Sequence, residues 1–292
     1  MTVVALFVKA IDDIRTWLQT QRQQIFEAPP PRTSAVPPVQ LLHWELKPET
    51  KLSIERASIQ ISALSNDCEL KLLHFNHFGK GAIKMLKFHP DMFMQMAIQL
   101  AFYRMHATFN ATYETGHTRA FFHGRTDTIR TLSIESVAFV EAMEDPVALP
   151  VEKLAKLKEA CKAHGDQLQR VLTGQGIDRH LLGLYIAANL RGGAIPALFS
   201  DVAYKRSGGG GNYRISTSNV GYTPLCGGFA PMTPDGYGVC YAQLERRMNL
   251  AITTWRSCPE TCADKFRTIL ATSLCDMYSM CTTANAEGGS KL

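Results

Sequence analysis

The sequence predicts a mixed fold, either an α+β protein or an α/β sandwich. Alternating residues predict strands at 68–78 and 214–220. Helical spacing of apolar residues predicts amphipathic helices at 2–25 and 151–172. These elements do not alternate regularly and no internal repeat is visible, which favours a mixed sheet packed against helices.

The composition is that of a soluble globular protein, with 46% hydrophobic and 20% charged residues in a chain of 292. A chain of this length can bury one large core or two smaller ones. The net charge of +5 is modest and no dense basic stripe appears, so nucleic-acid binding is not expected. No apolar run predicts a transmembrane helix, and no secretory signal is recognised.

The eight cysteines are scattered along the chain. Cys258 and Cys262 lie close together, but no second His or Cys pair completes a zinc site. We therefore expect free, partly buried thiols in a reducing compartment and no bound metal.

The first part of the chain predicts a helix and a stiff connection. The helix at 2–25 is followed by five prolines within 28–38, which predict an extended linker. A further helix is expected at 50–66. Pro90 then opens a helix to about residue 109, because proline is favoured at the first helical position. This helix is apolar nearly all round, so we expect it to be buried.

The second part continues the mixture of elements. We expect a flexible glycine-rich loop at 206–212, a turn at Asp235-Gly236, a strand at 236–241 and a final helix at 260–280. The loop lacks the Lys-Ser/Thr pair of a phosphate-binding P-loop, so a nucleotide site is not indicated.

The most informative stretch is 213–241. Strand alternation puts Ser216 and Ser218 on one face, and Gly227-Gly228 lets a ligand approach the backbone just before Phe229. One interpretation is an ordinary Ser/Thr-rich edge strand with a glycine-rich turn. A closed pocket for a polar, cationic ligand would use all of these residues.

This stretch resembles the choline/carnitine acyltransferase family. The triplet Ser216-Thr217-Ser218 is followed by Gly-Phe-x-Pro and then by Asp-Gly-Tyr-Gly-Val, which is a signature of that family. The resemblance implies a two-layer mixed-sheet sandwich of the CoA-dependent acyltransferase type. It also implies reversible transfer of an acyl group between coenzyme A and the carnitine hydroxyl, with the CoA thioester as a substrate and no separate cofactor.

Two lysines on a glycine turn form a candidate coenzyme A site. Lys80 and Lys84 suit phosphate groups, although a solvated basic loop would look the same. The resemblance implies that both lysines meet the ribose 3′-phosphate, and that Asp91 contacts the adenine or the pantetheine.

The resemblance also implies a site for the carnitine carboxylate, made by Tyr113, Thr126 and Arg179 with support from Ser216. Carnitine has a carboxylate and choline has none, and a buried arginine without an anion is costly. Choline-using relatives carry asparagine at the position of Arg179. The sequence therefore predicts a carnitine enzyme and disfavours a choline acetyltransferase.

We expect three further residues to contact the reacting groups or the acyl chain. Ser218 can donate a hydrogen bond to the tetrahedral oxyanion, and Phe229 can seat the trimethylammonium group. Acetyl-specific relatives carry methionine at the position of Gly227, so glycine here predicts an open channel for medium or long acyl groups.

The general base of the family is a histidine, and none of the nine histidines stands in the expected context. We therefore predict that residues 1–38 are the helix and Pro-rich crossover ending a first half, and that 39–292 are the carboxyl-terminal CoA/carnitine-binding domain. This chain alone is then inactive. The rival interpretation is a non-catalytic module that binds CoA or carnitine.

The chain ends in Ser290-Lys291-Leu292. A terminal Ser-Lys-Leu is a peroxisomal address that an import receptor reads. The sequence therefore predicts a peroxisomal location, with the receptor, acyl-CoA and carnitine as partners.

Overall fold

The computed structural model describes residues 14, 40–221, 223 and 226–289. It divides the chain into two compact units, Met1–Ser65 and Asn66–Leu292. The predicted helix at 50–66 is confirmed as α2 (Pro48–Asp67), which buries none of its residues. Of the predicted helix at 2–25 only Ile14 is described, as helical; the Pro-rich linker and the terminal tripeptide lie outside the described residues.

A six-stranded mixed sheet forms the centre of the second unit, with the order β1-β6-β5-β4-β2-β3. Its strands are β1 (Cys68–Phe75), β2 (Thr112–His117), β3 (Thr126–Arg130), β4 (Ile215–Asn219), β5 (Tyr237–Gln243) and β6 (Met248–Trp255). Strand β4 pairs in parallel with both β2 and β5, whereas the other three pairings are antiparallel. The Ser216 strand is therefore an internal strand and not an edge strand, and it forms no hairpin with β5.

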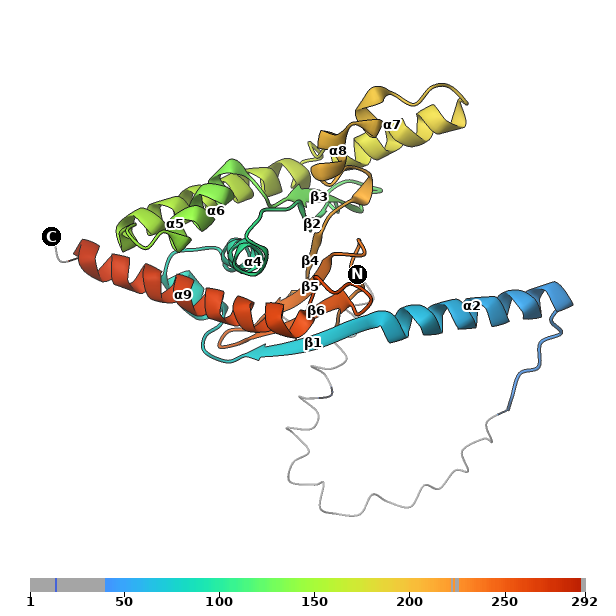
Figure 1. The fold of residues 1–292 in the computed structure, drawn as a ribbon, viewed down its shortest axis with the longest axis horizontal. Helices are drawn as coiled ribbons and strands as arrows, with labels where there is room; N and C mark the ends of the chain where they lie inside the picture. Colours follow the sequence, from blue (N-terminus) through green and yellow to red (C-terminus); the bar gives the residue numbers. More distant parts are fainter. Residues whose placement is uncertain (1–13, 15–39, 222, 224–225, 290–292) are drawn as a thin grey trace, which may run out of the picture. The chain divides into compact units, whose positions relative to one another are not determined.

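Four helices lie on the same side of this sheet (Figure 1). They are α4 (Pro90–His106), α5 (Ile134–Glu144), α6 (Pro150–Leu172) and α9 (Ala263–Gly289). Helix α4 begins with Pro90 at its first position and is buried along most of its length, as the sequence predicts. The sheet and these helices enclose one hydrophobic core, which confirms the mixed α/β sandwich.

Several boundaries differ from the prediction. Helix α4 stops at His106 because Ala107 adopts a left-handed φ of 51° that closes the last turn. Strands β2, β3 and β6 and helix α5 were not predicted. Helix α5 begins with a capping box, in which Ser133 accepts from the Ser136 amide and the Ser136 hydroxyl accepts from the Ser133 amide.

Two segments predicted as loops have regular structure. The lysine segment forms a short helix, α3 (Lys80–Met85), instead of a glycine turn. The glycine-rich segment follows α7 (Asp178–Leu190), η1 (Ala197–Ser200) and α8 (Val202–Arg206) and forms a 3₁₀ turn, η2 (Gly209–Gly211). Gly208, Gly210 and Gly211 all have positive φ there, a conformation that glycine adopts without steric cost.

Candidate functional site

Three of the side chains predicted to bind substrate, Tyr113, Ser216 and Ser218, share the sheet face opposite helix α4. On β4 the Thr217 hydroxyl accepts a hydrogen bond from Gln95 of α4, at 2.9 Å. Because side chains alternate along a strand, its neighbours Ser216 and Ser218 point to the other face. On β2 the Thr112 hydroxyl likewise meets α4, so the next side chain along β2 lies on the same open face as the two serines.

Strand pairing brings these residues together. Tyr113 on β2 is the direct partner of Ser216 on β4, and paired residues of a sheet lie on the same face. On the other side of β2, Thr128 of β3 is paired with Thr115, whose hydroxyl donates to the Tyr113 hydroxyl at 3.3 Å. The open face therefore carries a continuous patch of hydroxyl groups.

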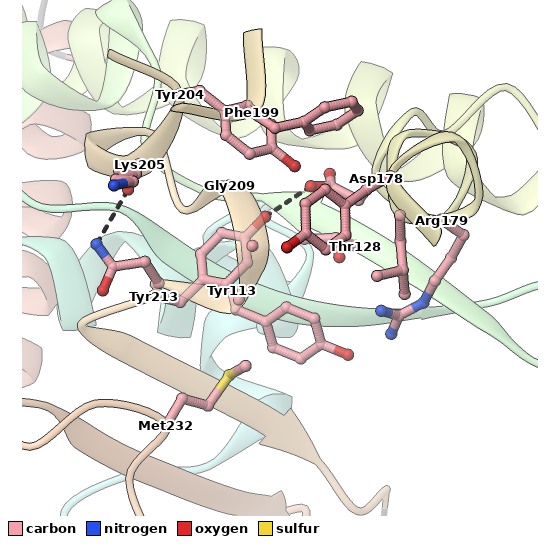
Figure 2. Close-up of a pocket in the computed structure, with 15 residues that line it drawn as sticks. Tyr113, Thr128, Asp178, Arg179, Phe199, Tyr204, Lys205, Gly209, Tyr213 and Met232 are labelled. Atoms are coloured by element: carbon pink, nitrogen blue, oxygen red, sulfur yellow. Dashed lines mark hydrogen bonds between the residues drawn. The ribbon is translucent and has the colours of Figure 1, made fainter. Parts of the chain in front are cut away.

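A cavity of about 680 Å³ adjoins this patch. Its lining includes Tyr113, Thr128 and Arg179, together with aromatic side chains from α7 to η2. Figure 2 shows the Arg179 guanidinium and the Tyr113 hydroxyl on the same side of the cavity. A guanidinium beside hydroxyl donors is suited to a carboxylate.

The predicted carnitine residues are only partly assembled around this cavity. Thr128, and not Thr126, lines it, while the Thr126 carbonyl accepts a hydrogen bond from Arg179 Nε at 3.3 Å. Ser216 is buried and Ser218 is half-buried on the neighbouring strand, outside the lining. Arg179 is exposed, so the expectation of a buried arginine is wrong for this chain.

The segment with Gly227 and Phe229 crosses the open face farther along the sheet. The Phe229 carbonyl accepts from the Thr253 hydroxyl of β6 at 2.6 Å. A Cβ atom added to Gly228 would meet the Leu70 and Thr253 side chains, so this part of the segment lies close to the sheet. Gly227 is exposed, and a Cβ atom there would meet nothing within 4 Å. The role of Gly227 in acyl length stays a prediction.

The predicted CoA lysines lie at another end of the sheet, beside the turn between β5 and β6. The Lys80 amide donates to the Leu244 carbonyl at 3.0 Å, and the Lys80 ammonium lies 3.9 Å from Glu245 Oε2. Gly79 allows this approach, because a Cβ atom would lie 2.4 Å from the Leu244 carbonyl oxygen. Lys84 is exposed on the same short helix, so both lysines are held near one turn.

Asp91 belongs to a buried polar network. Asn219 and the Tyr241 hydroxyl each donate to its Oδ1 at 2.7 Å. Asp91 is buried, with 8% of the residue exposed, and its contact with adenine or pantetheine stays a prediction.

Two titratable groups next to Asp91 are strongly perturbed. Glu114 Oε2 lies 2.6 Å from His164 Nε2. Burial, followed by the neighbouring Asp91 carboxylate, raises the pKa of Glu114 well above its ordinary value. Burial lowers the pKa of His164 to about 4, so His164 is neutral at physiological pH.

Helices α7 and α8 contribute residues that sequence reasoning missed. Asp178 accepts two hydrogen bonds from Arg130, at 2.7 and 3.1 Å, and one from the Tyr213 hydroxyl at 2.8 Å. Tyr185, Phe199 and other aromatic residues line the cavity beside them. The cluster of tyrosines around the glycine-rich segment is the signal that could have indicated a cavity.

The described residues hold no group of three or more His, Cys, Asp or Glu side chains able to bind a metal ion. None of the nine histidines, all of which are described, is among the residues that line the cavity. All eight cysteines are free thiols, as the sequence predicts. Within the described ranges no helix has the length and apolar character needed to cross a bilayer.

Two relatives of this chain are carnitine acyltransferases. The chain is 40% identical over 232 residues to the peroxisomal carnitine O-octanoyltransferase of Mus musculus, a match that covers 80% of this chain and 38% of that protein. It is 38% identical over 240 residues to the carnitine O-acetyltransferase of Homo sapiens, covering 82% of this chain and 38% of that protein. The chain thus spans less than two fifths of the length of these relatives.

A solved structure with a partial likeness is the epimerization domain from the third module of tyrocidine synthetase B. The match has a TM-score of 0.37 and 10% identity, and covers 75% of this chain and 49% of that one.

A family model decides the classification. The model described as choline/carnitine O-acyltransferase matches residues 2–272 and therefore most of the sequence. The chain belongs to the choline/carnitine O-acyltransferase family.

Proposed function

We propose that this protein takes part in the reversible transfer of an acyl group between coenzyme A and the hydroxyl of carnitine. The observation that carries the proposal is the meeting of Arg179 and Tyr113 at one cavity next to the hydroxyl-rich face of the sheet (Figure 2). Carnitine offers a carboxylate for this guanidinium. The curated relatives named above are carnitine acyltransferases, which supports the same substrate class.

In the proposed reaction, the carnitine hydroxyl attacks the thioester carbonyl and the CoA thiol leaves. Arg179, Tyr113 and Thr128, which line the cavity, hold the carboxylate, and Ser216 supports it from the neighbouring strand. The Thr126 carbonyl helps to hold the Arg179 guanidinium. Ser218 donates a hydrogen bond to the oxyanion of the tetrahedral intermediate. These residues supply binding and charge stabilisation at the open face.

Other residues bind the trimethylammonium group of carnitine, coenzyme A and the acyl chain. Phe229 seats the trimethylammonium group. Lys80 and Lys84 bind the 3′-phosphate of coenzyme A, and Asp91 contacts its adenine or pantetheine. Gly227 leaves room for a medium or long acyl chain, in line with the octanoyltransferase among the relatives.

The proton of the carnitine hydroxyl needs a general base, and the residues around the cavity include no histidine. We propose that the base comes from a further part of the enzyme, since the chain spans 38% of its carnitine acyltransferase relatives. The alternative is a non-catalytic module that binds CoA or carnitine. Choline acetyltransferase is disfavoured by Arg179.

The carboxylate site is tested by Arg179→Asn. Loss of a charge-assisted hydrogen-bond pair costs roughly 1.5–3 kcal/mol, so carnitine should bind ~10- to ~150-fold more weakly to the variant. Calorimetric titration of the purified chain with carnitine and with choline measures the effect. Arg191→Asn, at the exposed end of the same helix, is the control and should bind as the unaltered chain does. Equal affinity of Arg179→Asn for carnitine would exclude this carboxylate site.

We also propose a peroxisomal location, which Ser290-Lys291-Leu292 and the peroxisomal octanoyltransferase relatives support. A fluorescent protein that ends in this tripeptide should enter peroxisomes, and deletion of Leu292 should leave it in the cytosol. Import that persists after the deletion would contradict the proposed address.

A further inference from the structure

Asp127 connects strand β3 to the start of helix α7. It stands between Thr126 and Thr128, and strand alternation turns its side chain away from the face that carries their hydroxyls. Its Oδ1 accepts hydrogen bonds from the Thr128 amide at 2.7 Å and from the Arg179 amide at 3.2 Å. The carboxylate therefore binds a backbone N–H in the first turn of α7, where helix amides have no partner within the helix.

Close packing confines the Asp127 carboxylate. Its side chain is buried, with 7% of the residue exposed. A Cβ atom at Gly176, two residues before α7, would lie 2.2 Å from Asp127 Oδ2. The chain that enters the helix therefore runs directly against the carboxylate, and a side chain at this position would displace one of the two.

A second carboxylate fixes the neighbouring residue. Asp178 accepts two hydrogen bonds from the Arg130 guanidinium of β3 and one from the Tyr213 hydroxyl. Figure 2 shows Asp178 directed at Tyr213, while the side chain of Arg179 extends toward Tyr113. The first turn of α7 is thus bound to β3 at two successive residues, and both Asp178 and Arg179 line the cavity.

We propose that Asp127 is a positioning residue, which fixes the backbone of Arg179 so that the guanidinium meets the carboxylate of the substrate. Asp178, held by Arg130, fixes the same turn from its other side. Asp127 is not among the residues that line the cavity, and the Asp178 carboxylate is engaged by Arg130 and Tyr213. The inference rests on the proposed function and adds the residues that make Arg179 selective for a carboxylate-bearing quaternary amine.

The experiment compares binding of carnitine and of choline to the full 292-residue chain by calorimetric titration. Asp127→Ala should weaken carnitine binding about 10-fold, because a displacement of ~1 Å at a binding group costs up to ~10²-fold. Choline binding should stay unchanged. Asp127→Asn keeps an oxygen for the Arg179 amide and should bind carnitine within about 3-fold of the unaltered chain, since Asn and Asp cap helices about equally well.

Two controls separate positioning from general loss of structure. Asp166→Ala removes an exposed aspartate of α6 that pairs with Lys162, and should change neither affinity. Hydrogen exchange of the Arg179 amide is the readout that does not depend on any ligand. It should be faster in Asp127→Ala than in the unaltered chain, because the amide loses its acceptor.

The outcomes distinguish the inference from the proposed function. Equal losses for carnitine and choline in Asp127→Ala, or unchanged exchange at the Arg179 amide, would overturn the inference. An unaltered chain without preference for carnitine would overturn the proposed function, while faster exchange in Asp127→Ala would still support the fixing of Arg179. If Asp127→Ala does not fold, Arg130→Gln takes its place. It releases Asp178 and should lower carnitine affinity alone; equal affinity would overturn the inference.

Discussion

Glu114 is a carboxyl group buried between a histidine and a second carboxylate. Its residue is 4% exposed, and its network joins β2 to α6 through His164 and to α4 through Asp91. His164 Nδ1 has no hydrogen-bond partner among the described residues. Buried groups of this kind favour their neutral forms because a charge loses its hydration there. The free energy of unfolding should therefore depend on pH through the ionisation of Glu114 and His164.

The direction of that dependence follows from the two pKa shifts. The pKa of Glu114 is raised above 4.5, so its contribution to stability is complete below pH 4.5 and is lost as pH rises through the folded-state pKa. The pKa of His164 is lowered from 6.5 to about 4, so its contribution is present above pH 6.5 and is lost as pH falls toward 4.

Glu114→Gln should remove the loss of stability that occurs as pH rises. The amide keeps a donor for Asp91 and an acceptor for His164, but it cannot ionise. The variant should gain stability relative to the unaltered chain as pH rises above about 5, while the loss toward acid from His164 remains. Urea unfolding between pH 4 and pH 9 measures both profiles. Glu159→Gln on the exposed side of α6 is the control. Parallel profiles for the unaltered chain and Glu114→Gln would contradict this account.

At the scale of an element, the turn between β5 and β6 supports the lysine helix α3. Two backbone hydrogen bonds connect them, from Lys80 to Leu244 and from Gly81 to Glu245. Glu245 of this turn also lies near the Lys80 ammonium. The turn therefore positions the lysine helix and also places a carboxylate beside the proposed phosphate site. Gly79 is the residue on which this contact depends, because there is no room for a side chain.

Gly79→Ala should push the turn away from α3. The added Cβ atom would lie 2.4 Å from the Leu244 oxygen and 2.5 Å from the Arg247 nitrogen, both of which are backbone atoms. Overpacking of this kind costs roughly 1–3 kcal/mol. We expect a lower unfolding free energy and weaker binding of adenosine 3′,5′-bisphosphate, measured by urea unfolding and calorimetry.

Gly183→Ala on α7 is the matched control. A Cβ atom there meets nothing within 4 Å, and alanine favours a helix by roughly 0.5–1 kcal/mol over glycine. This variant should be slightly more stable and should bind the bisphosphate normally. A Gly79→Ala chain with unchanged stability and affinity would show that the turn does not support the site.

At the scale of the whole molecule, the cavity in the described part is lined by groups proposed to bind substrate and by no histidine. Exposed apolar side chains also follow helix α7, at Leu182, Leu184, Ile186 and Leu190. Exposed apolar patches of this kind are typical of surfaces that contact another protein part. Both features agree with a chain that spans 38% of its carnitine acyltransferase relatives.

The purified chain alone should therefore show no acyl transfer above background, since general-base catalysis contributes ~10²- to ~10⁴-fold. Addition of the amino-terminal part of a carnitine acyltransferase relative should restore it. Thiol release from acetyl-, octanoyl- and palmitoyl-CoA with carnitine measures the activity and the acyl preference together. Ser218→Ala in the restored enzyme should lower kcat by ~10²- to ~10³-fold. Robust activity of the chain alone would refute the need for a second part.

The sequence by itself determined the local elements and the candidate residues. Pro90 marks the start of α4, alternation places Ser216 and Ser218 on one face, and the signature around them indicates the family. These features depend on neighbours along the chain, because period, capping and motif are read within a few residues. Short strands such as β3, with five residues, carry too little pattern to be recognised in this way.

Only the tertiary structure decided which elements meet. It made β4 an internal strand with parallel partners, and it joined β4 to β2 through a hydrogen bond between residues 104 positions apart in the sequence. It placed Thr128 in the cavity in place of Thr126 and left Arg179 exposed. It also brought Asp127 to the first turn of α7, where its carboxylate accepts a hydrogen bond from the Arg179 amide. Pairing, burial and pKa shifts depend on side chains from distant segments, and a local pattern does not specify which segments those are.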